Sequence, residues 1–166
     1  APELTIPQWR DISANAGCCF AAELREDGSL APLPRAGRSY YPEELSELMK
    51  YKGKTNADFT RLLLHCARAV SGFAQSDAPL TVLDPMCGKG TTLFCALEEG
   101  DHAVGMDVDA KALLEADQLL GRSLKMNRLK HKREESSLTV PKGKPVRSVG
   151  YRLSTSIEGW KNGDER

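Results

Sequence analysis

The sequence has no apolar run near the roughly 20 residues that a helix needs to cross a bilayer. Its first residues also lack the charged stretch followed by an apolar stretch that marks a secretory signal. Lys plus Arg and Asp plus Glu both number 23, so the formal net charge is zero and excludes an overall attraction to nucleic acid or acidic membrane. We therefore expect a soluble, cytoplasmic protein with no membrane partner, whose basic partner surface, if it has one, is local.

Cysteine pairs with the spacing of metal or redox sites are also absent. The five cysteines stand at positions 18, 19, 66, 87 and 95, and no two of them form a C-x-x-C motif. We expect free thiols in a reducing compartment, and no metal site. With 166 residues, of which 40% are hydrophobic, the chain is long enough for one hydrophobic core and short for two.

Proline, glycine and alanine are frequent in residues 1–39, which we expect to be an irregular N-terminal segment with short strands. Within it, CCFAAELREDGSLAPLP predicts two strands that turn at Asp27 and Gly28. From about Ala57, apolar residues recur at helical spacing, and Thr55 or Asn56 can cap the first turn. This pattern predicts a helix that ends near residue 72.

Residues 80–125 alternate in the order strand, glycine loop, helix, strand and helix. That order is typical of a βαβ unit in a parallel sheet, so we assign residues 40–125 to one α/β core. At the end of its first strand the chain reads TVLDPMCGKGTT, in which an acid and two glycines follow an apolar run. Ligands of open parallel sheets bind at this place, because glycine lets the backbone approach and the next helix presents free N–H groups.

A second acid follows at the spacing that a βαβ ligand site requires. The geometry predicts an acid about 20 residues after the glycines, at the end of the next strand, where it holds ribose hydroxyls. Asp107 stands nineteen residues after Gly88. Cys87 has no histidine at a predictable place, so we interpret it as a thiol that lines the loop. Lys89 is expected to be a solvated loop residue.

Three ligand classes could use this arrangement. A dinucleotide fold has a third glycine where this chain has Leu93, which weakens that interpretation. A P-loop has a glycine five residues before Gly88, and this chain has none there. The remaining candidate is S-adenosylmethionine, which has a ribose, an adenine, a cationic ammonium and sulfonium end, and a carboxylate.

The side chains around the loop suit each part of that molecule. Asp107 matches the ribose, Val108 the adenine, and Asp84 the cationic end. The carboxylate of the ligand can accept N–H groups from the loop and from the helix start at Thr91 and Thr92.

These stretches resemble a known family. LDPMCGKGTTLFCAL followed by VGMDVD resembles motifs I and II of class I S-adenosylmethionine-dependent methyltransferases, in particular the amino-methyltransferases of RNA and DNA with the motif Asp-Pro-x-x-Gly-x-Gly-Thr. The upstream YYPEELSELMKYKGKTNADFTRLLLHCA is similar to the motif that precedes motif I in RNA methylases of the tRNA guanine-N2 type, and LKHKREESSLTVPKGK to a basic hairpin of some bacterial members.

The resemblance covers roughly residues 40–155 and implies an α/β fold: a Rossmann-like parallel sheet with a basic β-hairpin insertion. It implies S-adenosylmethionine as the cofactor and a nucleobase amine, in RNA, as the substrate. The implied cofactor-binding residues are Asp84, Met86, Cys87, Gly88, Gly90, Thr91, Thr92, Asp107, Val108, Thr55 and Asn56.

The chain departs from this family after Asp107. Those enzymes carry Asp/Asn-Pro-Pro-Tyr or Asp-Leu-Pro-Tyr at the end of a later strand, where it holds the target amine, and no such tetrapeptide follows here. We therefore expect an incomplete sheet, the cofactor-binding part of a longer methyltransferase, with no catalytic residue that can be assigned. Alone, it should bind cofactor without turnover, and associate with itself or with a partner chain that supplies the motif.

Two alternatives remain open: a non-catalytic S-adenosylmethionine-binding or partner subunit, and a dinucleotide-binding oxidoreductase.

Residues 126–166 are expected to form a basic hairpin and an irregular tail. Between Arg122 and Arg152 ten basic residues stand against two acidic ones, and β-prone runs flank Pro141–Pro145. Such a segment is either a solvated hairpin or a nucleic-acid contact. The residues that would contact RNA are Arg122, Lys125, Arg128, Lys130, Lys132, Arg133, Lys142, Lys144 and Arg147.

Overall fold

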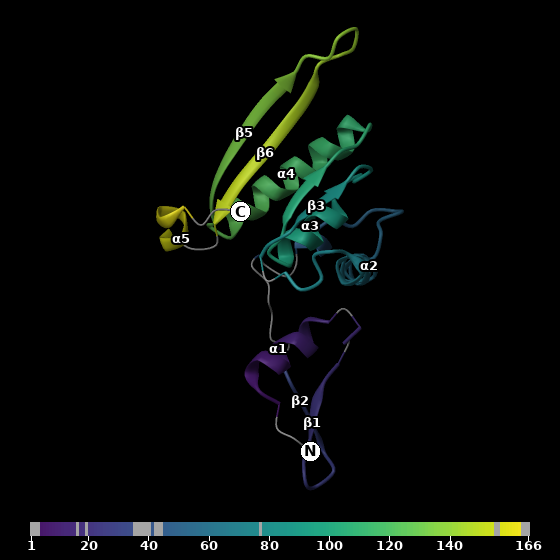
Figure 1. The fold of residues 1–166 in the computed structure, drawn as a ribbon, viewed down its shortest axis with the longest axis vertical. Coiled ribbons are helices and arrows are strands. Elements are labelled where there is room, and N and C mark those ends of the chain that lie inside the picture. Colours follow the sequence, from purple (N-terminus) through teal and green to yellow (C-terminus); the bar gives the residue numbers. More distant parts are fainter. Residues whose placement is uncertain are drawn as a thin grey trace.

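The computed structural model describes residues 4–15, 17–18, 20–34, 41, 45–76, 78–154 and 157–163. The chain is a mixed α/β protein in which the described residues form three two-stranded sheets (Figure 1). The elements, in chain order, are α1 Ile6–Ala14, β1 Ala22–Leu24, β2 Leu30–Pro32, the 3-10 helix η1 Leu45–Glu47, α2 Ala57–Val70, β3 Thr81–Asp84, α3 Thr91–Glu98, β4 His102–Gly105, α4 Ala110–Met126, β5 Lys130–Leu138, β6 Val146–Ser154 and α5 Ile157–Asn162.

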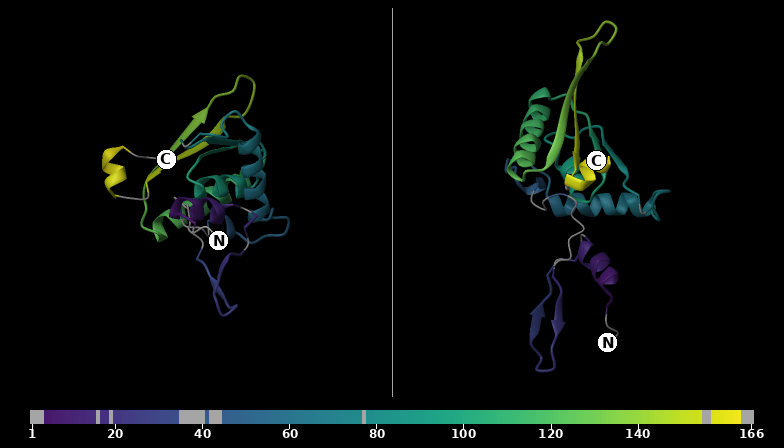
Figure 2. Two further views of the ribbon diagram at one scale, coloured as in Figure 1. Left: turned by 60° about the horizontal axis from the view of Figure 1, so that its bottom comes forward. Right: turned by 90° about the vertical axis from the view of Figure 1, so that its left-hand side faces the viewer.

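The N-terminal elements α1, β1 and β2 lie to one side of the other elements (Figures 1 and 2). The predicted strand pair is confirmed: β1 and β2 are antiparallel, and Gly28 adopts a φ of +76° in their turn. Helix α1 was not predicted. It starts with a capping box, in which Thr5 accepts a hydrogen bond from the N–H of Gln8 and the Gln8 side chain accepts one from the N–H of Thr5.

Helix α2 begins at Ala57, as predicted. The side chain of Asn56 caps it by accepting a hydrogen bond from the N–H of Phe59 at 2.9 Å. The helix ends at Val70, two residues earlier than expected, because Ser71 is in an extended conformation and its hydroxyl donates to the carbonyl of Arg68.

The predicted βαβ unit is confirmed. Strands β3 and β4 are parallel, with Val82 opposite Ala103, and α3 connects them. A hydrophobic core joins Tyr41 and η1 to α3, α4 and β6; its buried members are Tyr41, Leu45, Phe94, Leu119, Leu124 and Leu153. This core fixes the base of the βαβ unit, and the ends of its strands carry the candidate site.

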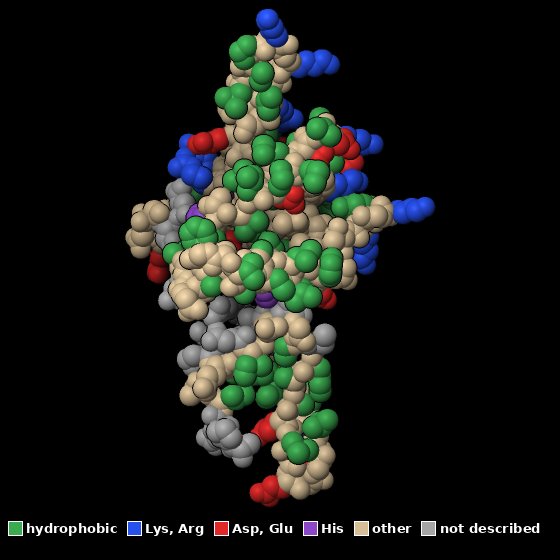
Figure 3. Space-filling view, turned by 45° about the vertical axis from the view of Figure 1, so that its right-hand side comes forward, with side chains coloured by type: hydrophobic (Ala, Val, Ile, Leu, Met, Phe, Trp, Pro, Cys, Tyr) green, Lys and Arg blue, Asp and Glu red, His purple; other side chains and the backbone are tan. Residues whose placement is uncertain are grey.

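One face of the β3–β4 pair is uncovered by the described residues. Leu83 of β3 is 58% exposed and Val104 of β4 is 47% exposed. Helix α2 has a further exposed apolar stripe at helical spacing that includes Phe59, Leu63 and Val70. Figure 3 views the side on which α2 and β3 lie and shows hydrophobic side chains gathered there. Parallel strands are usually buried on both faces, so this surface is suited to further packing.

The structure contains the predicted basic hairpin. Strands β5 and β6 pair antiparallel from Lys130 opposite Ser154 to Leu138 opposite Val146, around the expected loop. The first strand begins at Lys130, in a stretch of charged residues that includes the cross-strand pairs Glu135–Arg147 and Glu134–Arg152. The tail expected to be irregular contains the short helix α5. Among the described residues, no helix is both long and apolar enough to span a membrane.

Candidate functional site

The loop after β3 is held in a tight turn by hydrogen bonds among its own residues. The Asp84 carboxylate accepts a hydrogen bond from the N–H of Met86 at 3.0 Å, and Gly90 N–H donates to the carbonyl of Cys87 at 2.8 Å. Gly88 and Gly90 have φ values of +53° and +87°, a left-handed conformation that side chains disfavour. Both glycines that the sequence singled out are thus required by the backbone.

Asp107 lies against this loop. Its Oδ2 accepts a hydrogen bond from the N–H of Gly88 at 2.7 Å, and its Oδ1 accepts one from the N–H of Asp109 at 2.8 Å. The N–H groups of Asp109 and Gly88 lower the pKa of the Asp107 carboxyl, which is therefore ionised at neutral pH. The structure thus brings together the acid and the glycine loop that spacing had paired.

Gly105 permits the close packing beneath this site. A Cβ at Gly105 would lie 2.8 Å from Cys87 Sγ and closer still to Leu93 Cδ1. Leu93 of α3 therefore packs directly over the end of β4. The N–H of Cys87 also donates to the carbonyl of Met106 at 3.0 Å. Sequence reasoning missed Gly105, although a glycine at the last position of a strand was a usable signal.

The first turn of α3 is open to a ligand. Gly90 is its N-cap and supplies no side-chain hydrogen bond. Thr91 and Thr92 therefore present backbone N–H groups that have no partner within the helix. The positive end of the helix dipole also lies here, so the position favours an anion.

The other predicted cofactor-binding residues differ in how they are placed relative to the glycine loop. Met86 is 83% exposed and the side chain of Val108 is fully exposed, so both project into solvent beside the loop. Asn56 uses its side chain as the α2 cap. Thr55 is exposed next to it, and no hydrogen bond joins either residue to the glycine loop within the described part of the chain.

Two cysteines close to the glycine loop have raised thiol pKa values. Burial raises the pKa of the Cys87 thiol, and burial raises that of Cys95 to about 11. The Cys95 thiol donates to the carbonyl of Ala57 at the start of α2. Cys18, Cys66, Cys87 and Cys95 are all free, as predicted, and Cys19 lies outside the described residues.

Lys89 is a partly exposed loop residue that also makes two contacts which the sequence did not predict. Its amine lies 2.6 Å from Glu115 Oε2 of α4 and 4.5 Å from the centre of the Tyr51 ring, and its side chain is 29% exposed. Lys89 therefore connects the glycine loop to α4 and to the segment before α2. Neither contact could be found from sequence, because Tyr51 and Glu115 are far from Lys89 along the chain.

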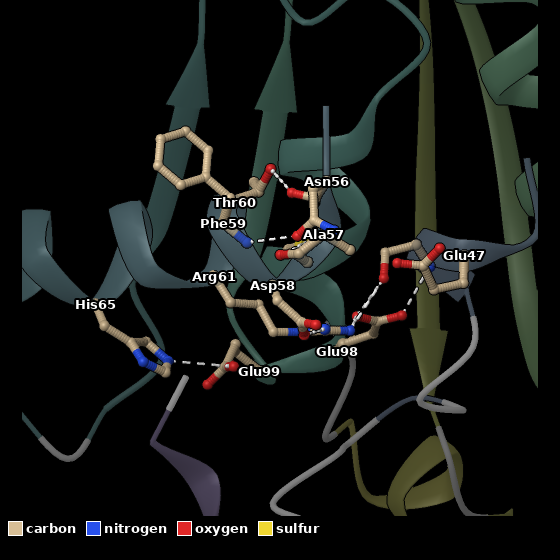
Figure 4. Close-up of polar contacts among 12 residues, drawn as sticks. Glu47, Asn56, Ala57, Asp58, Phe59, Thr60, Arg61, His65, Glu98 and Glu99 are labelled. Carbon is tan, nitrogen blue, oxygen red and sulfur yellow. Dashed lines mark hydrogen bonds and ion pairs between the residues drawn. The ribbon is translucent and has the colours of Figure 1, made fainter. Parts of the chain in front are cut away.

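A buried ion pair holds α2 and η1 against α3 (Figure 4). Glu98 is 4% exposed and lies 2.7 Å from Arg61 Nη2. The same carboxylate accepts hydrogen bonds from the N–H and the hydroxyl of Ser46. This network fixes the position of α2 relative to the glycine loop, which α3 directly follows.

The charged side chains on the paired strands β5 and β6, the shaft of the hairpin, are largely neutralised by ion pairs. Glu135 pairs with Arg133 and Arg147, and Glu134 pairs with Lys132 and Arg152. Arg133 also pairs with Asp117 of α4 at 2.8 Å. Six predicted RNA contacts have no ion pair within the described residues: Arg122, Lys125, Arg128 and Lys130 near the base, and Lys142 and Lys144 at the tip.

Tyr151 completes the attachment of the hairpin to α4. Its hydroxyl donates to the Asp117 carboxylate at 2.5 Å. The hydrogen bond from Arg133 lowers the pKa of Asp117, with a further contribution from Tyr151.

Within the described residues, no group of three or more His, Cys, Asp or Glu side chains could hold a metal ion. No protein-family model, curated protein or solved structure matches this chain.

Proposed function

We propose that the loop at residues 84–92, together with Asp107 and Val108, binds S-adenosylmethionine. On this proposal the chain is a class I methyltransferase unit of Rossmann-like topology that acts on a nucleobase amine, with RNA as the substrate. The observation that carries the proposal is the 2.7 Å hydrogen bond between Gly88 N–H and Asp107 Oδ2. It joins a glycine loop to an acid at the end of the next strand, the two parts from which nucleoside sites of parallel sheets are built.

The residues present fit the cofactor. Each Asp107 oxygen accepts one backbone hydrogen bond, and a carboxylate has about four acceptor positions, so acceptors remain for two ribose hydroxyls. The exposed Val108 side chain offers an apolar surface for the adenine. The open N-terminus of α3 suits the cofactor carboxylate.

The cofactor, when bound, supplies a methyl group on a positively charged sulfur. The chain's own contribution is binding and orientation. Asp84 places a negative charge beside the loop for the ammonium, and the N–H groups at Thr91 and Thr92 take the opposite end of the amino-acid part. Opposed charges at the two sides of the loop would give the cofactor one orientation.

A second candidate is a non-catalytic cofactor-binding or partner subunit. The uncovered apolar face at Leu83, Val104 and α2 favours it, because a partner chain that covers this face could also carry the amine-holding group. A dinucleotide ligand remains an alternative as well. Leu93 had argued against it, but Gly105 makes room for Leu93, so α3 approaches β4 without a third helix glycine.

Calorimetric titration of the purified chain with S-adenosylmethionine and, separately, with NADH tests the cofactor. We expect binding of S-adenosylmethionine alone, and Asp107→Ala should weaken it by roughly 10- to 100-fold, as the loss of charge-assisted hydrogen bonds does. Glu26→Gln, which changes an exposed acid of the β1–β2 turn with no described contact, is the control and should bind as the wild type does. Preferential NADH binding, or equal affinity of Asp107→Ala and wild type, would overturn the proposal.

A further inference from the structure

Lys89 occupies an unusual place in the glycine loop. It stands between two glycines with positive φ, so the backbone conformation fixes the direction in which its side chain leaves the loop. From there its amine reaches Glu115 of α4 at 2.6 Å and lies over the Tyr51 ring, 4.5 Å from its centre. Three separate segments thus meet at one ammonium group.

Tyr51 belongs to a turn that is held from its other side. The carbonyl of Tyr51 accepts a hydrogen bond from the N–H of Lys54, and the Lys54 amine pairs with Glu47 of η1 at 2.8 Å. The turn leads directly to Asn56, the cap of α2. Among the described residues, the contact between the Lys89 amine and the Tyr51 ring links this turn to the glycine loop.

We propose that Lys89 is a positioning residue, which holds the Tyr51–Lys54 turn and helix α4 against the glycine loop and so shapes one wall of the ligand site. This inference rests on the proposed function, since the wall matters only if the loop binds the cofactor. The charge of Lys89 serves two neighbours at once: a carboxylate attracts it, and so does the negative face of an aromatic ring. Glu115 also raises the pKa of the Lys89 ammonium through their hydrogen bond.

The role differs from that of an ordinary surface ion pair. A surface pair links two side chains and contributes little, because water competes for both of them. Lys89 and Glu115 are both about one-third exposed, and the aromatic ring covers the amine on another side. Loss of the amine should therefore loosen the turn and α4 at the loop, while the buried core keeps its packing.

The experiment compares Lys89→Met and Lys89→Arg with Lys52→Met. Lys52 is an exposed lysine of the same turn with no described contact, so its variant is a matched control. Lys89→Met should weaken S-adenosylmethionine binding by roughly five- to tenfold, as expected for loss of one cation–π contact and one partly exposed ion pair. Lys89→Arg keeps both kinds of contact and should restore affinity to within about twofold of the wild type.

A double-mutant comparison separates positioning from stability. Tyr51→Leu alone should weaken binding, and adding it to Lys89→Met should weaken binding little further, because both remove the same contact. The midpoints of urea unfolding of the same variants should show much less coupling between Tyr51 and Lys89 than their binding affinities do. Hydrogen exchange of the free protein should be faster at residues 51–54 in Lys89→Met than in Lys52→Met.

The outcomes distinguish the two proposals. If the wild type does not bind S-adenosylmethionine, the proposed function fails, and the positioning role falls with it. If the wild type binds, Asp107→Ala does not, and Lys89→Met binds as well as Lys52→Met, the proposed function stands and the role of Lys89 is refuted. Failure of Lys89→Arg to restore affinity would also count against it.

Discussion

The βαβ unit and the β5–β6 hairpin carry their charges in opposite ways. In the βαβ unit one carboxylate, Glu98, is buried and shared by Arg61 and Ser46. In the hairpin, Glu134 and Glu135 each pair with two basic residues, but all lie at the surface. The number of ion pairs therefore says little about stability, because burial decides whether the loss of a partner is costly.

The two regions also differ in what forms their shape. The glycine loop is built by backbone hydrogen bonds and two positive-φ glycines, which leave the site open. The hairpin is a ladder of paired strands with charged side chains on both faces. The first arrangement makes a tight loop at the end of a strand, and the second makes an extended arm.

The largest effect should come from breaking the buried pair. Glu98→Ala would leave Arg61, whose side chain is 14% exposed, without its buried partner and remove two hydrogen bonds to Ser46. We expect a loss of roughly 3 kcal/mol or more in the free energy of unfolding, measured with urea. Glu135→Ala in the hairpin is the matched comparison and should cost far less, because water replaces its partners. Equal losses would show that burial does not separate the two regions.

A smaller effect should follow from adding one methyl group in each region. Gly105→Ala would place a Cβ against Leu93 and Cys87, so we expect a loss of about 1–3 kcal/mol from overpacking. In the hairpin, Gly150→Ala meets no atom within 4 Å and should be close to neutral. The same urea titration compares them, and a neutral Gly105→Ala would mean that α3 can move away from β4.

Sequence reasoning succeeded where structure is determined locally. The α2 cap, the two glycines and the βαβ order follow from neighbouring residues, and the Gly88–Asp107 pairing follows from the fixed geometry of a parallel crossover. It failed where residues far apart in the chain meet. The contacts of Lys89 with Tyr51 and Glu115, and of Arg133 with Asp117, required the three-dimensional fold. The capping box of α1 was a local signal that went unused.

The attachment of the hairpin to α4 should depend on pH. The hydrogen bonds from Arg133 and Tyr151 lower the pKa of Asp117 in the folded protein. Its contribution is therefore present above the unfolded pKa of about 3.9 and is lost as pH falls through the lower folded value. Asp117→Asn should lose on the order of 1 kcal/mol of stability at pH 7, and the difference from wild type should shrink toward pH 3.

Urea titrations of both proteins at several pH values measure this difference. Glu26→Gln, which removes an exposed acid of the β1–β2 turn with no described contact, is the control and should follow the wild type closely. A difference between Asp117→Asn and wild type that stays constant with pH would rule out the charge of Asp117 as the cause.

The smallest effect should distinguish the tip of the hairpin from its shaft. Lys142 and Lys144 have no ion pair among the described residues, whereas Arg147 is held by Glu135 at 2.7 Å. A lysine free of protein partners can neutralise an RNA phosphate without first giving up an acid, and exposed Leu138 and Val146 nearby can contact an unstacked base. If the arm binds RNA, the tip should make the contact.

Replacing both Lys142 and Lys144 with alanine should reduce the slope of log K against log salt by roughly 1.4, which is about 0.7 for each phosphate contact to single-stranded RNA. Arg147→Ala should leave the slope nearly unchanged, because its charge is already neutralised within the hairpin. Fluorescence anisotropy with a labelled single-stranded RNA over a range of KCl concentrations provides both slopes. A wild-type affinity that does not vary with salt would make the whole arm a solvated hairpin, and a larger change for Arg147→Ala would move the contact from the tip to the shaft.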